Sequence, residues 1–189
     1  MIEPIVENIR KSRVVWLPLK NSKKMIDCQS ILNSWKSQEF KFIEENVEFE
    51  KAGLRIPQIG ALYSLLGYLK SDNNKPATIV MPTGTGKTEV ILSSIIAGKF
   101  EKTLIIVPSD ALREQTSDKL IKSGLLRELG LITEEFLNPI VAIIKHGLLE
   151  EDTSSILKSN VIIATASALS KVSSTVLESF SQNCSHLII

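Results

Sequence analysis

The pattern of apolar and polar positions is clearest after residue 53. Apolar residues recur at helical spacing after Pro57 in "IPQIGALYSLLGYLK", which predicts a helix. A polar loop, "SDNNKP", precedes "ATIVM" at 77–81, a short apolar run typical of a strand buried on both faces. A Gly-rich turn follows, and "KTEVILSSIIAG" predicts a helix ending near Gly98.

The same alternation continues to the last residue. We predict strands in "TLIIVP", "NPIVAIIKHG", "NVIIAT" and "HLII", and helices in "SDALREQTSDKLIKSG", capped by Ser109 or Asp110, and in "SSTVLESF". Strands and helices in alternation, with β-branched strand cores, predict an α/β fold with a parallel sheet and crossover helices.

Residues 1–52 are predicted to form an N-terminal arm or accessory layer, and 53–189 the main domain. "VVWLPLK" has the pattern of a strand, and Pro18 favours an edge position. The stretch from "SILNSW" onward mixes charged and aromatic residues at roughly helical spacing and ends at Gly53, which predicts a helix.

Composition excludes several classes of protein. With 43% hydrophobic and 23% charged residues and a net charge of +1, the 189-residue chain is predicted to be globular. The two cysteines, Cys28 and Cys184, have no disulfide or zinc spacing, and we expect reduced thiols in a cytoplasmic protein. No apolar run is long enough to cross a membrane, and no secretory signal is recognisable.

The stretch "MPTGTGKTE" at 81–89 predicts a phosphate-binding loop, because it lies between a predicted strand and a predicted helix. Lys87 would contact the β- and γ-phosphates and the Thr88 hydroxyl would bind Mg²⁺. The loop departs from the general pattern once, with Met81 at the first glycine position. The residues predicted to bind ATP here are Pro82, Thr83, Gly84, Thr85, Gly86, Lys87 and Thr88, with Lys87 and Thr88 also serving catalysis.

A loop "PTGTGKT" preceded by a residue other than glycine resembles motif I of superfamily 2 helicases and translocases, whose first domain is a RecA-like phosphate-loop NTPase. "LRIPQ" at 54–58 is similar to the adenine-sensing glutamine motif, in the form found in motor subunits of type I and type III restriction enzymes. The resemblance covers 54–189 and implies that Gln58, with Arg55 beside it, binds the adenine end of ATP. From the residue alone, Gln58 on an amphipathic helix is otherwise a solvated surface residue.

Two further stretches resemble motifs that contact the nucleic-acid backbone. "IIVPSDALREQ" supplies Pro108, Ser109 and Arg113, and "IIATASAL" supplies Thr165. Thr165 and Ser167 could equally cap the next helix, and Arg113 could be a solvated helix residue. His146 is interpreted as a loop histidine and His186 as the start of the last strand.

The resemblance also implies an acidic box directly after "SHLII", and a later strand inserted between that strand and the one before the phosphate loop. We therefore expect the chain to be the N-terminal part of a larger ATP-dependent motor that acts on nucleic acid, DNA rather than RNA. Its RecA-like domain would be completed by missing regions or by a partner subunit. Alone, the chain is expected not to hydrolyse ATP. Two alternatives stay open: a stump that binds nucleic acid or a partner without hydrolysis, and a phosphate-loop ATPase outside superfamily 2.

Overall fold

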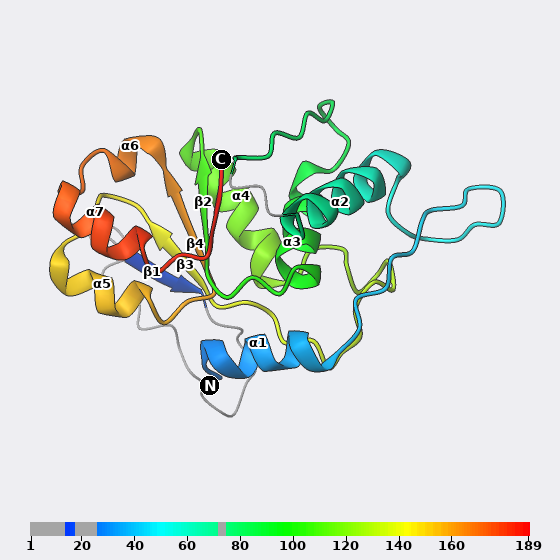
Figure 1. Cartoon of the computed structure of the whole chain (residues 1–189), viewed down its shortest axis with the longest axis horizontal. Helices are drawn as coiled ribbons and strands as arrows, with labels where there is room; N and C mark the ends of the chain where they lie inside the picture. The colour runs from blue at the N-terminus through cyan, green and yellow to red at the C-terminus, as the bar shows by residue number, and fades with distance from the viewer. Residues whose placement is uncertain (1–13, 18–25, 72–74) are drawn as a thin grey trace. The chain divides into compact units, whose positions relative to one another are not determined.

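The computed structural model describes residues 14–17, 26–71 and 75–189 (Figure 1). The chain divides into two compact units. The sheet unit comprises the described part of residues 1–33 together with 100–122 and 138–189, and the helical unit comprises 34–99 and 123–137. Helix α1 (Cys28–Ser37) contains the boundary between them.

Among the described residues, the sheet unit contains five strands in the order β1-β3-β4-β2-β5. These are β1 (Val14–Leu17), β2 (Thr103–Val107), β3 (Val141–Ile144), β4 (Val161–Thr165) and β5 (His186–Ile188). The last four are parallel to one another, whereas β1 pairs antiparallel with β3 at one edge. The predicted α/β fold and the predicted strand in "VVWL" are therefore confirmed; Pro18 lies outside the described residues.

Helices cover the sheet because its central strands are apolar on both faces. Alternate residues such as Leu104, Ala142 and Ile162 pack with α5 (Glu150–Ile156), α6 (Ala166–Leu169) and α7 (Ser174–Ser181). Helix α4 (Asp110–Ile121) also packs against β2, β3 and β4. All five residues of β4 are buried, as expected for a parallel strand between two neighbours.

The helical unit contains α2 (Ile56–Leu69) and α3 (Lys87–Ala97), which pack against each other. Both helices were predicted. Their core includes Leu62, Leu92 and Ile95, which are almost completely buried. The Trp35 indole is also completely buried, and its Nε1 donates a hydrogen bond to the carbonyl of Leu137 at 2.8 Å.

Two expectations about secondary structure are wrong, and one helix was missed. Residues 77–81 form no strand, and Val80 is 89% exposed, because this run pairs with no other strand in the described part of the chain. The N-terminal helix ends at Ser37, not at Gly53, because 43–54 form a hydrogen-bonded turn in which Asn46 Oδ1 accepts from the Phe49 N–H. Helix α5 was not predicted, because "EEDTSSI" has no apolar stripe.

Candidate nucleotide and nucleic-acid sites

The phosphate loop lies entirely in the helical unit and leads into α3. Gly84 and Gly86 have φ of 82° and 81°, a left-handed conformation that side chains disfavour. The loop folds around the carbonyl of Pro82, which accepts hydrogen bonds from Thr85 Oγ1 at 2.7 Å and from Lys87 Nζ at 3.3 Å. Pro82, Thr83, Gly84 and Lys87 are exposed. The structure thus brings together the glycines, Lys87 and Thr88 at the start of one helix.

The start of α3 has the chemistry of an anion site. Its N-cap is Gly86, and no side chain caps the first turn. Backbone N–H groups and the positive end of the helix dipole at such a terminus favour a phosphate. A Cβ on Gly86 would lie 2.1 Å from Gln58 Nε2, so only glycine allows the loop to pass this close to Gln58. The residues present therefore fit a nucleotide phosphate.

Arg55 and Gln58 hold the phosphate loop from the start of α2. Gln58 Nε2 donates to the carbonyl of Gly86 at 3.3 Å, and Gln58 Oε1 accepts from the Arg55 N–H at 2.9 Å. Arg55 NH1 donates to the carbonyl of Gly84 at 3.5 Å. Gln58 is only 6% exposed, so the interpretation of Gln58 as a solvated surface residue is wrong. The contact between Gln58 and adenine stays a prediction.

Glu89, in the first turn of α3, lies beside the phosphate loop and was not singled out from the sequence. It is 5% exposed, and its Oε2 would lie 3.2 Å from a Cβ on Gly86. An acidic residue in the first turn of a helix is common for reasons of helix stability alone. The sequence signal was therefore present but did not separate a site residue from an ordinary helix start.

A hollow of about 430 Å³ lies in the sheet unit, at the ends of β2, β3 and β4. Three of the four residues predicted to contact nucleic acid line it: Pro108, Ser109 and Thr165. We call it the strand-end hollow, and its other lining residues are Asp110, Lys145, His146, Ser167, Ala168 and Lys171.

The hydroxyls in the strand-end hollow also cap helices. Ser109 Oγ accepts from the Leu112 N–H at 3.3 Å at the start of α4. Thr165 Oγ1 accepts from the Ala168 N–H at 3.2 Å at the start of α6. The alternative in which Thr165 caps a helix is therefore observed, and its contact with a phosphate stays a prediction.

Arg113 does not line the hollow. It is 4% exposed, and its guanidinium contacts Asp110 Oδ1 at 2.8 Å and the carbonyl of Ile144 at 3.4 Å. The interpretation of Arg113 as a solvated helix residue is wrong. Arg113 is buried beside the first turn of α4, where its guanidinium neutralises the Asp110 carboxylate.

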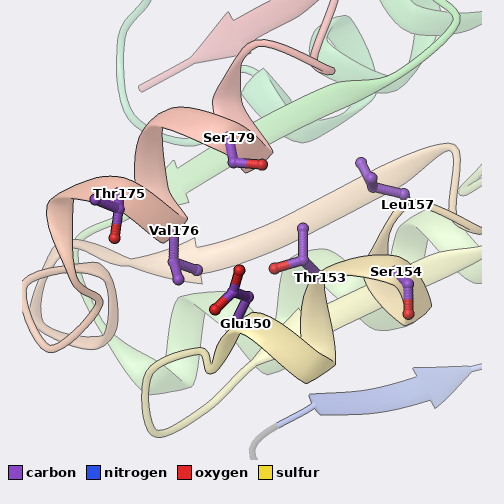
Figure 2. Close-up of a pocket in the computed structure, with 7 residues that line it drawn as sticks. All are labelled: Glu150, Thr153, Ser154, Leu157, Thr175, Val176 and Ser179. Atoms are coloured by element: carbon purple, nitrogen blue, oxygen red, sulfur yellow. The ribbon is translucent and has the colours of Figure 1, made fainter.

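A second hollow in the sheet unit, of about 320 Å³, lies between α5 and α7 (Figure 2). Its polar groups are one carboxylate, that of Glu150, and the hydroxyls of Thr153, Ser154, Thr175 and Ser179. Among the side chains that the structure describes, no cationic group lines this hollow, and none of the predicted site residues does. Its chemistry does not fit a phosphate.

The described residues contain no group of three or more His, Cys, Asp or Glu side chains placed to hold a metal ion. The binding of Mg²⁺ by the Thr88 hydroxyl stays a prediction. His186 begins β5 as predicted, and its ring stacks on Phe100 with centroids 3.5 Å apart. Burial lowers the pKa of His186 below its usual value. In the described part of the chain, no helix has the length and apolar character needed to cross a membrane.

Comparison with known proteins gives one family. The family described as type III restriction enzyme, res subunit, matches residues 51–189, which is more than half of the chain. The matched region contains the phosphate loop, the glutamine segment and the strand-end hollow. No curated protein and no solved structure matched the chain.

Proposed function

Because the chain belongs to the family of type III restriction enzyme res subunits, which are helicase-like ATP-dependent enzymes of nucleic acid, we propose that it binds ATP·Mg²⁺ at the phosphate loop and a DNA strand at the strand-end hollow. The choice of DNA over RNA is supported by the restriction enzymes that give the family its description. The protein would act in the cytoplasm, in restriction, repair or defence against phage, and its two free cysteines agree with a reducing compartment.

The observation that carries this proposal is the contact between the start of α2 and the phosphate loop, two segments that lie about thirty residues apart in the sequence. Gln58 and Arg55 both donate to loop carbonyls, and the loop itself has the left-handed glycines that a phosphate cradle needs. A glycine turn alone occurs in many proteins. A turn at a helix N-terminus with a buried glutamine amide against it is a specific arrangement.

Each residue has a role that follows from its chemistry. Lys87 exchanges the carbonyl of Pro82 for the β- and γ-phosphates, and the hydroxyl of Thr88 binds Mg²⁺. Mg²⁺ held through Thr88 would supply positive charge that neutralises the phosphates. Gln58 has an amide that can both donate to and accept from the adenine edge, which favours ATP over GTP.

The first experiment measures ATP binding by calorimetry for the wild type and for Lys87→Ala. We expect Lys87→Ala to abolish detectable binding, since the lysine is the main positive charge on the phosphates. Lys70→Ala is the control, because Lys70 is an exposed lysine of the same unit at the other end of α2. Equal affinities of wild type and Lys87→Ala would rule out the phosphate loop as the nucleotide site.

The second experiment compares ATP and GTP with Gln58→Ala. We expect the preference for ATP to be lost, because an alanine presents no amide to the base. A preserved preference would show that Gln58 only holds the phosphate loop, through its bond to Gly86.

Binding and hydrolysis are separable functions of this chain. The described residues near the loop provide a phosphate-binding lysine and one magnesium ligand, and we propose that they bind ATP without turning it over. A phosphate-release assay on the same preparation tests this proposal. Turnover at the rate of a complete motor, about 1 s⁻¹ or more, would contradict it.

A further inference from the structure

The strand-end hollow contains two lysines on two different loops that touch each other. Lys145 follows β3 directly, and Lys171 follows α6. Gly147, with φ of 96°, belongs to the loop that carries Lys145, and a Cβ there would lie 3.3 Å from Lys171 Cβ and 3.5 Å from the Lys171 carbonyl oxygen. Glycine at 147 therefore allows the two lysine-bearing loops to pack closely, so that both lysines line one hollow.

The acidic side chains beside the hollow are already paired. Arg113 contacts Asp110 Oδ1 at 2.8 Å and Glu114 Oε1 at 3.4 Å. Lys145 Nζ lies 3.5 Å from Glu114 Oε1. The buried arginine thus offsets the negative charge of both carboxylates in the first turns of α4. The two lysines therefore carry more positive charge than the remaining carboxylate charge can balance.

We propose that Lys145 and Lys171 bind successive or shared backbone phosphates of the nucleic-acid strand, and that Arg113 is a positioning residue whose guanidinium offsets the negative charge of Asp110 and Glu114 beside that strand. This inference rests on the proposed function, since it names the groups that bind the strand at the same site. Lys145 exchanges its partner when the strand binds: the Glu114 carboxylate is replaced by a phosphate, and Glu114 stays paired with Arg113.

The hollow selects the backbone rather than the bases. The described side chains that line it are short hydroxyls, Pro108, Ala168, one carboxylate, two lysines and His146, and none of them is a Phe, Tyr or Trp that could stack on a base. Phosphate contacts of this kind position a strand without reading its sequence. Strands of the same length and different sequence should therefore bind with the same affinity.

The test measures the affinity of the whole chain for a labelled single-stranded DNA oligonucleotide by fluorescence anisotropy over a range of salt concentrations. Each lysine that binds a phosphate contributes about 0.7 to the slope of log K against log salt for a single strand. We expect Lys145→Ala and Lys171→Ala each to reduce the slope by that amount and to weaken binding several-fold, and the double variant to lose about 1.4.

Lys158→Ala is the matched control. Lys158 is an exposed lysine of the same unit that precedes β4, at the opposite end of that strand from the hollow. Its replacement should leave the slope unchanged. Lys171→Ala retains the Cβ that lies near Gly147, so it removes the charge while the packing of the two loops is kept.

Arg113 is tested in two backgrounds. Arg113→Met should weaken strand binding, because Asp110 and Glu114 are left with uncompensated charge beside the hollow. In a background that already carries Asp110→Asn and Glu114→Gln, Arg113→Met should no longer weaken binding, whereas removal of a direct phosphate contact would weaken binding equally in both backgrounds. If Arg113→Met does not fold, Glu114→Gln alone serves: it frees Lys145 from its pair and should raise the affinity above that of the wild type.

The outcomes separate this inference from the proposed function. Lysine variants that keep the wild-type slope would overturn the phosphate contacts of Lys145 and Lys171. The role of Arg113 would be overturned if Arg113→Met weakened binding equally in both backgrounds, or if Glu114→Gln failed to gain affinity. In either case, ATP binding and its loss in Lys87→Ala would still support the nucleotide site. A wild type that binds ATP but neither the DNA oligonucleotide nor an RNA of the same sequence would overturn the inference and the nucleic-acid part of the proposed function together.

Discussion

Strand β4 and residues 77–81 have almost the same apolar character, "VIIAT" against "ATIVM", yet they have opposite structures. Every residue of β4 is buried between β3 and β2, with parallel pairing on both sides. Residues 77–81 form no strand, and only Met81 is buried. The difference teaches that an apolar run becomes a strand only where backbone partners exist, because its N–H and C=O groups must otherwise be left to water.

The largest expected effect tests this comparison directly. Ile163→Ala in β4 should lower the free energy of unfolding by about 2–5 kcal/mol, because it leaves a cavity in a completely buried position. Val80→Ala should change it by less than about 0.5 kcal/mol, since Val80 is 89% exposed. Urea unfolding of both variants gives the two values. A large cost for Val80→Ala would mean that 77–81 are packed in solution.

The second prediction compares the two glycines of the phosphate loop that follows 77–81. Gly84→Ala meets open space, and its left-handed φ alone should cost about 1 kcal/mol. Gly86→Ala has the same backbone strain and also places a Cβ 2.1 Å from Gln58 Nε2. We expect it to destabilise the protein more and to weaken ATP binding by displacing the Gln58 amide. Calorimetry and urea unfolding measure the two effects, and equal results for both glycines would contradict the close approach of Gln58.

The third prediction concerns the start of α4, the helix that follows β2. Ser109→Ala removes the side chain that caps this helix and should cost about 1 kcal/mol. Ser109→Asp should restore the stability, since aspartate is an equally good N-cap. The same variant should weaken DNA binding, because it adds a negative charge to the strand-end hollow. If Ser109→Asp restored stability and left DNA affinity unchanged, the strand would not pass this helix start.

These contrasts show what the sequence could predict. Positions such as Ile163 and the helix start at Lys87 were predictable, because periodicity and glycine placement are local signals. The lack of a strand partner for 77–81 in the described part of the chain was not predictable, since pairing depends on which segments are neighbours in space. The resemblance to a family motif singled out Gln58 as an adenine contact, whereas its hydrogen bond to the Gly86 carbonyl and the pairing of buried Arg113 with Asp110 follow from side-chain packing that no spacing encodes.

The smallest expected effect concerns β5, which pairs with β2 alone among the described strands. Burial against Phe100 lowers the pKa of His186 from its ordinary value of 6.5, so the folded chain resists protonation more than the unfolded chain does. The stabilising contribution is complete above pH 6.5 and is lost as the pH falls through the lowered pKa of the folded state.

Urea midpoints measured between about pH 8 and pH 5 should therefore decline toward acid, and the decline should be smaller in His186→Phe, which keeps an aromatic ring on Phe100 but cannot titrate. His146→Asn is the control, because His146 is exposed. An identical decline in wild type and His186→Phe would show that β5 does not hold His186 against Phe100 in solution. A smaller decline in the variant would mean that β5, which pairs on one side only, is packed firmly enough to lower the pKa of His186 in solution. Residues 77–81, by contrast, have no strand partner among the described residues.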